Sequence, residues 1–349
     1  MRCCKRLDGD CILGILQSGC EVFGRSGWCM SLPLVPSRAH GLLSELLPSE
    51  NAGKGWPWTT ESKLIPPVMS NDKPWPKISI VTPSYNQGQF IEETIRSVLL
   101  QNYPNLEYII MDGGSTDNSV KIIKKYEPWL TYWVSEKDNG QADAIQKGFQ
   151  KATGEVIGWL NSDDFFLPDA LVKVGEKIHE DPGMEFIVGG GMLVDNEGRL
   201  FDKYYSFPQS FESLLSIGQF SLQMSSFWRR DVYSEIGGLD TGLRFCFDYD
   251  FFLRLTRRRQ PGGIDSLLSA SRMHPGSKTS TIFVTVALPE ADLVRKRYGF
   301  DEWSESEKEN KRRYFSRQYH LNKRRAIIRD LIYDPVYFFK QLKRKISSF

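Results

Sequence analysis

Cysteine is almost absent from the main part of this 349-residue chain, because five of its six cysteines fall within the first 29 residues. Only Cys246 follows, which excludes a disulfide framework for the fold. The early cysteines also lack the paired Cys-x-x-Cys spacing of a zinc site. We interpret residues 1–29 as a disordered or mistranslated leader, with Met30 as the start of the protein. A secretory signal is the competing interpretation, but Asp8 and Asp10 interrupt it and its apolar run is short.

Long hydrophobic runs are missing too, since none approaches the roughly 18 residues of a membrane-spanning helix. The formal charge of +2 hides an asymmetry: residues 311–349 hold 12 Lys or Arg and two Asp, which leaves a net charge of −8 for residues 1–310. An acidic body argues against a nucleic-acid partner. The basic tail is either a pair of helices packed on the body or an anchor at an anionic membrane surface. Both interpretations stay open.

A regular alternation of strands and helices begins at Lys77. Four apolar strands, about 25 to 30 residues apart and each followed by a helix, predict an α/β fold with a largely parallel sheet. Two further strands around the turn Asp-Asn-Glu-Gly at 195–198 indicate mixed pairing beyond it. The four strands are expected at 77–82, 106–111, 131–136 and 155–160, and the four helices at 89–101, 116–126, 141–151 and 168–179.

The same pattern predicts the limits of the main domain. Residues 30–76 are rich in Pro, Ser, Gly and Trp without periodicity, so we interpret them as a lead-in segment. The main domain spans 77–288 and a basic helical extension spans 289–349.

Polar loops follow all four predicted parallel strands, and in an open sheet ligands bind beyond these carboxyl ends. A single such loop is explained by turns and helix caps, but four on one edge indicate a site for a cation or a polar ligand. Neither G-x-G-x-x-G nor a P-loop follows the first strand, so a nucleotide diphosphate here would be met by a divalent metal, with Asp163 as its ligand. The loops are P-S-Y-N-Q-G-Q, D-G-G-S-T-D, E-K-D-N-G-Q-A-D and N-S-D-D.

These loops, together with the later G-G-L-D and F-D-Y-D-F-F-L-R-L, resemble the family 2 glycosyltransferases of the GT-A fold over residues 77–280. The resemblance implies a Rossmann-like, mostly parallel sheet with mixed C-terminal strands, helices on both faces and a helical tail. It also implies a nucleotide-binding half at 77–180 and an acceptor half at 181–288. The implied reaction transfers a sugar from a nucleotide-diphosphate sugar, commonly UDP-linked, with inversion and with Mg²⁺ or Mn²⁺ as cofactor. The expected acceptor is a hydroxyl of a cell-surface glycan or a lipid-linked saccharide, as in polysaccharide biosynthesis.

The resemblance assigns the donor-binding residues one by one. It places the Pro83 to Tyr85 loop and Asp112 at the nucleotide base and Asn161 near the ribose. The full expected set for the nucleotide sugar is Pro83, Tyr85, Asp112, Asp138, Gln141, Asn161, Ser162 and Lys278.

Asp163 matches the second acid of the family's D-x-D motif and is the expected metal ligand, whereas Asn161 replaces the first acid. The metal would neutralise the charge that develops on the leaving diphosphate. Asp164 either supports Asp163 or begins the following turn. His274 is the second expected metal ligand, although a lone histidine is more often structural.

Asp248 aligns with the general base that takes the proton of the attacking hydroxyl. Its alternative role is that of a helix N-cap, and Phe247 stands where the family usually has Glu. Asp250 precedes Arg254 by four residues, which is typical of an ion pair along a helix. Gln223 and Trp228 are expected at the acceptor, with a buried core role as the alternative for Trp228.

Two other functions remain as alternatives, a nucleotidyltransferase and a non-catalytic nucleotide-sugar binding protein. The first would want a Gly-rich and basic signature after the first strand, which S-Y-N-Q-G-Q does not supply. We expect a cytoplasmic protein, either free or at the inner face of the membrane.

Overall fold

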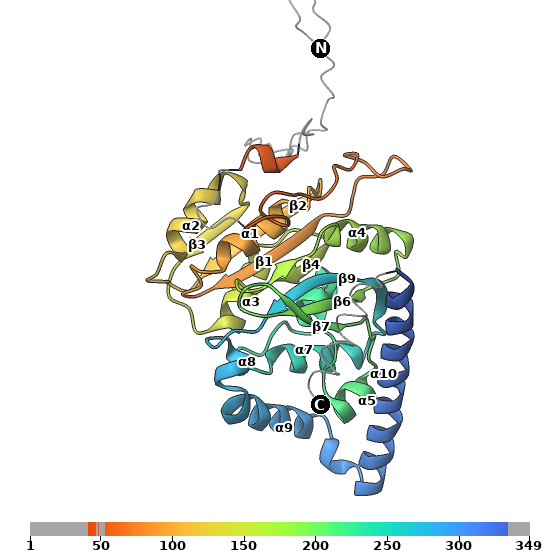
Figure 1. Ribbon diagram of the computed structural model, residues 1–349. Coiled ribbons are helices and arrows are strands. Elements are labelled where there is room, and N and C mark those ends of the chain that lie inside the picture. Colours follow the sequence, from red (N-terminus) through yellow and green to blue (C-terminus); the bar gives the residue numbers. More distant parts are fainter. Residues whose placement is uncertain (1–40, 47, 49–52, 334–349) are drawn as a thin grey trace, which may run out of the picture. The chain divides into compact units, whose positions relative to one another are not determined.

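The structure is a computed structural model that describes residues 41–46, 48 and 53–333. The predicted leader at 1–29, the first ten or so residues of the lead-in segment and residues 334–349 of the basic extension lie outside the described residues. Within the described part, nine strands form one mixed sheet with helices on both faces (Figure 1). The predicted α/β architecture is therefore confirmed.

The first half of the sheet is parallel, in the order β3-β2-β1-β4. The strands are β1 (Ile78–Ser84), β2 (Leu106–Asp112), β3 (Tyr132–Ser135) and β4 (Val156–Trp159), and the helices that follow them are α1 (Ile91–Leu99), α2 (Ser119–Tyr126), α3 (Gln141–Lys151) and α4 (Ala170–Glu180). All four predicted strand–helix units occur within a few residues of their expected positions. The register places Ser84 beside Asp112 and Asp112 beside Ser135, so the carboxyl ends of three strands meet at one edge.

The second half is mixed, as the sequence predicts. The chain turns back after β6 (Phe186–Val194) into β7 (Leu200–Tyr204) through a turn in which Gly198 has a φ of 79°, a conformation that glycine adopts without strain. β8 (Ser226–Arg229) pairs antiparallel with both β4 and β6, and β9 (Gly262–Arg272) runs parallel to β6 and antiparallel to the short β5 (Phe165–Phe166). The β4–β8 pairing joins the two halves into one continuous sheet.

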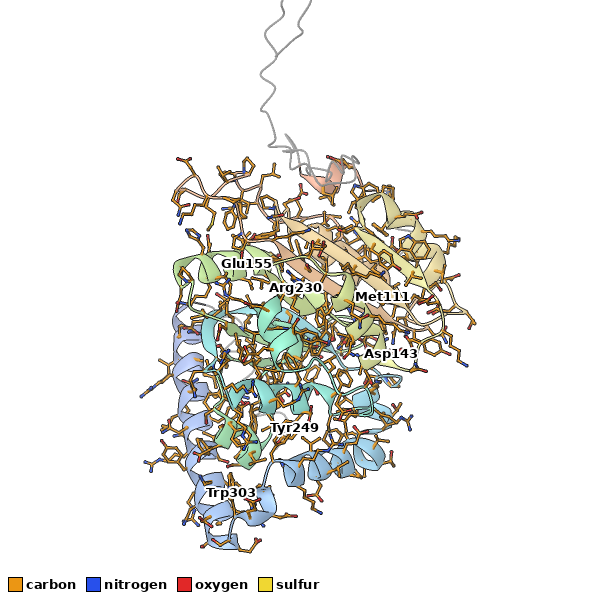
Figure 2. The ribbon with its side chains drawn as sticks, turned by 180° about the vertical axis from the view of Figure 1, so that it is seen from behind. Met111, Asp143, Glu155, Arg230, Tyr249 and Trp303 are labelled. Carbon is orange, nitrogen blue, oxygen red and sulfur yellow. The ribbon has the colours of Figure 1, made fainter. Side chains whose placement is uncertain are left out.

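Side chains alternate across the strands and fill two separate cores. Along β2, Tyr108 and Ile110 face the layer of α1, α2 and α4, whereas Ile109 and Met111 face the layer that contains α3 and α7. The view from behind (Figure 2) shows Tyr249 on α7 and Arg230 at the start of α6, which also contributes to this second layer. Because both faces are covered, β1 is buried along its whole length.

The remaining helices follow the second half of the sheet. They are α5 (Phe211–Ile217), α6 (Arg230–Glu235), α7 (Phe247–Thr256), α8 (Lys278–Thr281), the π-helix η4 (Phe283–Ala287), α9 (Leu288–Arg297) and α10 (Glu305–Tyr333), with 3-10 turns η1 (Leu42–Ser44), η2 (Glu127–Trp129), η3 (Gln223–Ser225) and η5 (Phe300–Glu302). The long helix α10 runs beside α5 (Figure 1), where Lys311 pairs with Glu212 at 2.9 Å. No helix in the described ranges combines the length and the apolar character needed to cross a bilayer.

The described part of the lead-in segment packs on α1 and β5. The guanidinium of Arg96 donates to the carbonyls of Pro57 and Trp58, and the indole of Trp56 donates to the carbonyl of Phe166 at 2.7 Å. The indole of Trp75 is buried against Tyr103. Trp56 and Trp75 therefore help to attach this segment to the rest of the fold.

Candidate active site

A cavity of about 880 Å³ opens at the carboxyl ends of the parallel strands. The loops after β1, β2, β3 and β4 all line it, and the opposite wall comes from the second half of the chain, including the loop before α7 and the end of β9. The predicted site residues that line it are Pro83, Tyr85, Asp138, Gln141, Asn161, Ser162, Asp163, Gln223, Asp248 and Lys278. The other three, Asp112, Trp228 and His274, lie behind this surface.

Asp163 and His274 are neighbours at the cavity wall. His274 Nε2 lies 3.1 Å from Asp163 Oδ2, and the imidazole is buried against the ring of Phe90, with centroids 4.7 Å apart. His274 therefore reaches the site through Asp163. The carboxylate and the imidazole form a two-ligand donor set of the kind that binds divalent metals.

Asp164, next in the chain, is a buried residue of the cavity lining whose carboxylate oxygens are both hydrogen-bonded. Its Oδ1 accepts from the backbone N–H of Arg272 at 2.9 Å and its Oδ2 accepts from the side-chain amide of Asn161 at 3.0 Å. Burial, and secondarily the neighbouring Asp163 carboxylate, raise the pKa of Asp164 well above its ordinary range. Asp164 thus supports the loop that presents Asp163, which is one of its two expected roles.

Arg272 is a cavity residue that the sequence reasoning missed. Its guanidinium pairs with Glu93 at 2.6 Å, donates to the carbonyl of Asn196 at 2.9 Å and donates to the backbone carbonyl of Asp163 at 3.2 Å. It also lies over the ring of Phe90, 4.9 Å from the centroid. Arg272 therefore connects α1, the loop after β4 and the β6–β7 turn next to Asp163. Its position two residues before His274 was the only available signal.

Asp112 is buried at the end of β2 and shapes a loop. Its carboxylate accepts from the backbone N–H groups of Gly114 and Ser115 and from the hydroxyls of Ser115 and Ser135, at 2.6 to 3.2 Å. Gly113 and Gly114 line the cavity, whereas the Asp112 side chain does not. The structure therefore brings the loop, and not this carboxylate, to the place where the sequence predicts the nucleotide base.

Tyr85 stands at the rim of the cavity with 62% of its surface exposed, so one face of its ring is open to a ligand. The loop that carries it is held by its neighbour, since the backbone N–H of Asn86 donates to the hydroxyl of Ser115 at 2.7 Å and that of Gly88 donates to Asp117 at 2.8 Å. The loops after β1 and β2 thus form one connected wall.

Two glutamine side chains are hydrogen-bonded in the cavity wall, and the second of them connects the two halves of the site. Gln141, the first residue of α3, donates to Asn161 Oδ1 at 2.7 Å, and Asn161 in turn donates to Asp164. Gln223 is buried and donates to the backbone carbonyl of Trp159 at 2.9 Å, across the β4–β8 boundary. Both glutamines line the cavity, and their expected contacts with donor and acceptor stay predictions.

Asp248 is the second residue of α7, whose N-cap is Cys246, so Asp248 does not cap this helix. Its Oδ1 accepts from the backbone N–H of Tyr249 at 2.8 Å. Burial raises the pKa of Asp248 to about 6, against the lowering effects of the Tyr249 N–H and the Lys278 ammonium. A carboxylate with a pKa near 6 is well matched to a general base at neutral pH.

Trp228 is fully buried in the core and does not reach the cavity. Its ring packs on Trp159, with centroids 5.3 Å apart, and on Phe251, at 4.9 Å. The structure thus gives this residue its alternative core role. The aromatic cavity wall comes instead from Trp159, Phe245 and Phe247.

Asp250 is structural, as expected. It is buried, and Arg254 donates to its Oδ2 at 2.9 Å while the hydroxyl of Tyr298 donates to its Oδ1 at 2.9 Å. These bonds tie α7 to the end of α9 and leave Asp248 as the acid of α7 that faces the cavity.

The glycosyl transferase family 2 model matches residues 79–237. An uncharacterised glycosyltransferase of Mycobacterium tuberculosis (strain H37Rv) is 31% identical over 195 residues, which cover 55% of this chain and 74% of the relative. The chain belongs to glycosyltransferase family 2, and it is a glycosyltransferase. These matches leave the nucleotidyltransferase alternative without support.

Solved structures confirm the predicted GT-A fold. Residues 1–349 of TarS from S. aureus, in complex with UDP-GlcNAc, superpose with a TM-score of 0.53 at 17% identity, covering 68% of this chain and 71% of that one. The mannosyltransferase PcManGT from Pyrobaculum calidifontis, in complex with GDP-Man and Mn²⁺, superposes with a TM-score of 0.50 at 16% identity, covering 80% of this chain and 85% of that one. At these identities the likeness concerns the fold.

Proposed function

We propose that this glycosyltransferase moves a sugar from a nucleotide-diphosphate sugar to a hydroxyl of a saccharide, with inversion of the anomeric carbon. The observation that carries the proposal is that Asp163 and Asp248 line one cavity but come from opposite halves of the fold, the end of β4 and the start of α7. Single displacement needs the leaving group and the base on opposite sides of the reacting carbon. A UDP-linked donor is favoured, and the UDP-GlcNAc complex of TarS supports it.

The donor lies along the loops after β1 to β4 in this proposal. The exposed ring of Tyr85 stacks on the nucleotide base beside the loop that Asp112 shapes. Asp138 and Asn161 accept hydrogen bonds from the ribose or the sugar. The amino-terminal end of α3, at Gln141, faces the cavity, where the helix dipole favours a diphosphate.

A divalent ion fits the donor set of this site. Asp163 and His274 supply two ligands, and among the described residues no group of three or more His, Cys, Asp or Glu surrounds a single point. Mg²⁺ is commonly held by one or two carboxylates together with substrate phosphates and water, which suits a site with few protein ligands. Bound Mg²⁺ or Mn²⁺ neutralises the charge of the leaving diphosphate. The Mn²⁺ complex of PcManGT supports this cofactor.

Asp248 accepts the proton of the acceptor hydroxyl as that oxygen bonds to the anomeric carbon. Its carboxylate is ionised above about pH 6, and Lys278 favours this charged form. Lys278 lines the cavity, and its Nζ donates to the carbonyl of Arg244 at 3.0 Å. The saccharide acceptor rests against Gln223 and the aromatic rings of Phe245 and Phe247, since aromatic faces suit the C–H surface of a sugar.

The test is turnover with a panel of UDP- and GDP-sugars in the presence of Mn²⁺, with hydrolysis of the donor as the readout that needs no acceptor. Asp248→Asn, nearly identical in shape, should abolish transfer to an added saccharide while UDP still binds. Asp250→Asn is the matched control on the same helix, because that carboxylate is bonded to Arg254 and Tyr298 away from the cavity. Full transfer by Asp248→Asn would reject the assignment of the base.

We also propose that α10 rests on an anionic membrane surface. Its exposed apolar side chains Tyr314, Leu321 and Ile328 recur every seven residues and so lie on one face of the helix. The arginines beside them are Arg317, Arg324 and Arg325. An apolar stripe flanked by arginine is typical of helices that lie in the lipid interface.

Sedimentation with phosphatidylglycerol vesicles tests this contact. The full chain should pellet with them and not with phosphatidylcholine vesicles, and Arg317→Glu with Arg324→Glu should abolish pelleting. Lys173→Glu with Lys177→Glu on α4 is the charge-matched control and should pellet normally. Equal pelleting of both double variants would contradict the proposal.

A further inference from the structure

Three consecutive backbone N–H groups just before α7 point at one carboxylate. Arg244 donates to Glu290 Oε1 at 2.8 Å, and Phe245 and Cys246 donate to Glu290 Oε2 at 2.8 and 2.9 Å. Glu290 lies in the first turn of α9, 44 residues beyond Cys246. Hydrogen bonds to a charged acceptor are about twice as strong as neutral ones, so this carboxylate holds the segment 244–246 firmly.

Other residues of α9 secure the same region. Arg297 pairs with Asp240 at 2.7 Å, within the loop between α6 and α7. Arg295 donates to the hydroxyl of Tyr249 at 3.3 Å, and Tyr249, labelled in Figure 2, donates to Leu214 of α5 at 2.8 Å. The loop and the first turn of α7 are therefore attached to α9 at several points, and Glu290 is the α9 residue that accepts from the three backbone N–H groups directly before the helix.

The segment that Glu290 holds belongs to the cavity. Arg244 and Phe245 line it, and Asp248 follows two residues after Cys246. Because α7 begins at Phe247, the position of segment 244–246 fixes where the helix starts and where the Asp248 carboxylate faces. Placement of a reacting group matters steeply, since a displacement of about 1 Å can cost roughly 100-fold in rate.

We propose that Glu290 is a positioning residue of the transfer reaction, which holds segment 244–246 so that the Asp248 carboxylate faces the acceptor hydroxyl. The inference rests on the proposed role of Asp248 as the base. Glu290 lies outside residues 79–237, the part of the chain that the family model matches. The extension beyond the main domain thus contributes to catalysis without touching the substrate.

Glu290→Gln is the decisive variant, because it keeps the shape of the side chain but replaces one accepting oxygen by an NH₂ group. The expected result is a fall in kcat on the order of 10- to 100-fold with the donor KM and the UDP affinity nearly unchanged. Hydrogen exchange at the amides of residues 244–246 should become faster. Asp292→Asn on the same helix is the matched control, since Asp292 is exposed and pairs with Lys296 at 3.0 Å; its kcat should equal that of the wild type.

Two results would overturn the inference. Faster hydrogen exchange at residues 244–246 with an unchanged kcat would mean that Glu290 holds this segment but does not position the base. A fall in kcat/KM that comes from a higher KM would mean that Glu290 acts in donor binding. Asp248→Asn, measured in parallel, tests the proposed function separately. The proposed base is rejected only if Asp248→Asn retains transfer, whatever the result for Glu290→Gln. If Glu290→Gln does not fold, Glu290→Asp, which keeps the charge with a shorter reach, must show the same fall in kcat at constant KM.

Discussion

Asp163 and His274 are 111 residues apart in the chain, yet His274 Nε2 lies 3.1 Å from Asp163 Oδ2 at the wall of the cavity. His274→Ala should weaken Mn²⁺-dependent UDP binding by at least about 10- to 100-fold, because it removes one proposed ligand that also bonds to the other, and loss of a group bonded to a metal ligand alone typically costs that much. Calorimetric titration of UDP with and without Mn²⁺ measures the effect. His179→Ala is the control, since His179 lies on α4 and its imidazole is hydrogen-bonded to Asn71. Identical Mn²⁺-dependent binding in both variants would contradict the metal assignment.

As the proposed base, Asp248 should give the reaction a defined pH dependence. Its pKa is raised by burial to about 6, and a base acts only when ionised, so kcat/KM should fall as the pH drops through about 6. Lys278→Met removes a charge that lowers this pKa, so the acidic limb should move to higher pH whatever the variant does to the donor KM. A pH profile with a limb near pH 4, the ordinary range of aspartate, would show that the titrating group lies elsewhere.

Asp112→Asn distinguishes a structural carboxylate from a contact with the nucleotide base. The bonds to Gly114, Ser115 and Ser135 predict a loss of about 2 to 3 kcal/mol in the free energy of unfolding, because buried donors lose a charged acceptor. UDP affinity should fall in parallel, since Gly113 and Gly114 line the cavity. Urea denaturation and UDP titration measure the two effects. Reduced affinity at full stability would instead favour the direct contact that the sequence predicts.

Trp228→Phe probes the core beneath the acceptor side. The smaller ring leaves space beside Trp159 and Phe251, so the free energy of unfolding should drop by about 1 to 3 kcal/mol. The acceptor KM should stay constant, because the indole does not reach the cavity. Phe245→Ala is the comparison from the cavity wall and should raise the acceptor KM with little loss of stability. A higher acceptor KM in Trp228→Phe would instead support the contact with the acceptor that the resemblance implies for Trp228.

Much of the first half of the fold is predictable from the sequence, because strand and helix patterns alternate there at regular intervals. The polar loops also locate the site, since the carboxyl ends of parallel strands meet at one edge. Orientation is harder to predict. In β8, Phe227 packs in one core and Trp228 in the other, and a strand buried on both faces carries no polar alternation that tells which side chain meets a ligand.

Contacts between distant segments account for what the sequence did not predict. Arg272 bonds to residues on three other elements, and Glu290 lies in a helix whose sequence is charged and ordinary. Neither has a local spacing that signals its role. Both act on backbone groups of segments brought together only by the β6–β9 and α7–α9 packing, so the pattern along the chain does not identify them.

The antiparallel pairing of β4 with β8 has a mechanical consequence for substrate entry. Val156 and Ile157 of β4 pair with Arg229 and Trp228 of β8. The two sides of the cavity, proposed for donor and acceptor, are therefore connected to adjacent strands of a single sheet. The two walls do not separate by a hinge motion, because that motion would break the backbone hydrogen bonds between β4 and β8. We therefore expect a nucleotide sugar to enter and leave without a hinge motion between the two halves of the sheet, past the cavity-lining segments 137–140 and 276–282, the second of which contains α8.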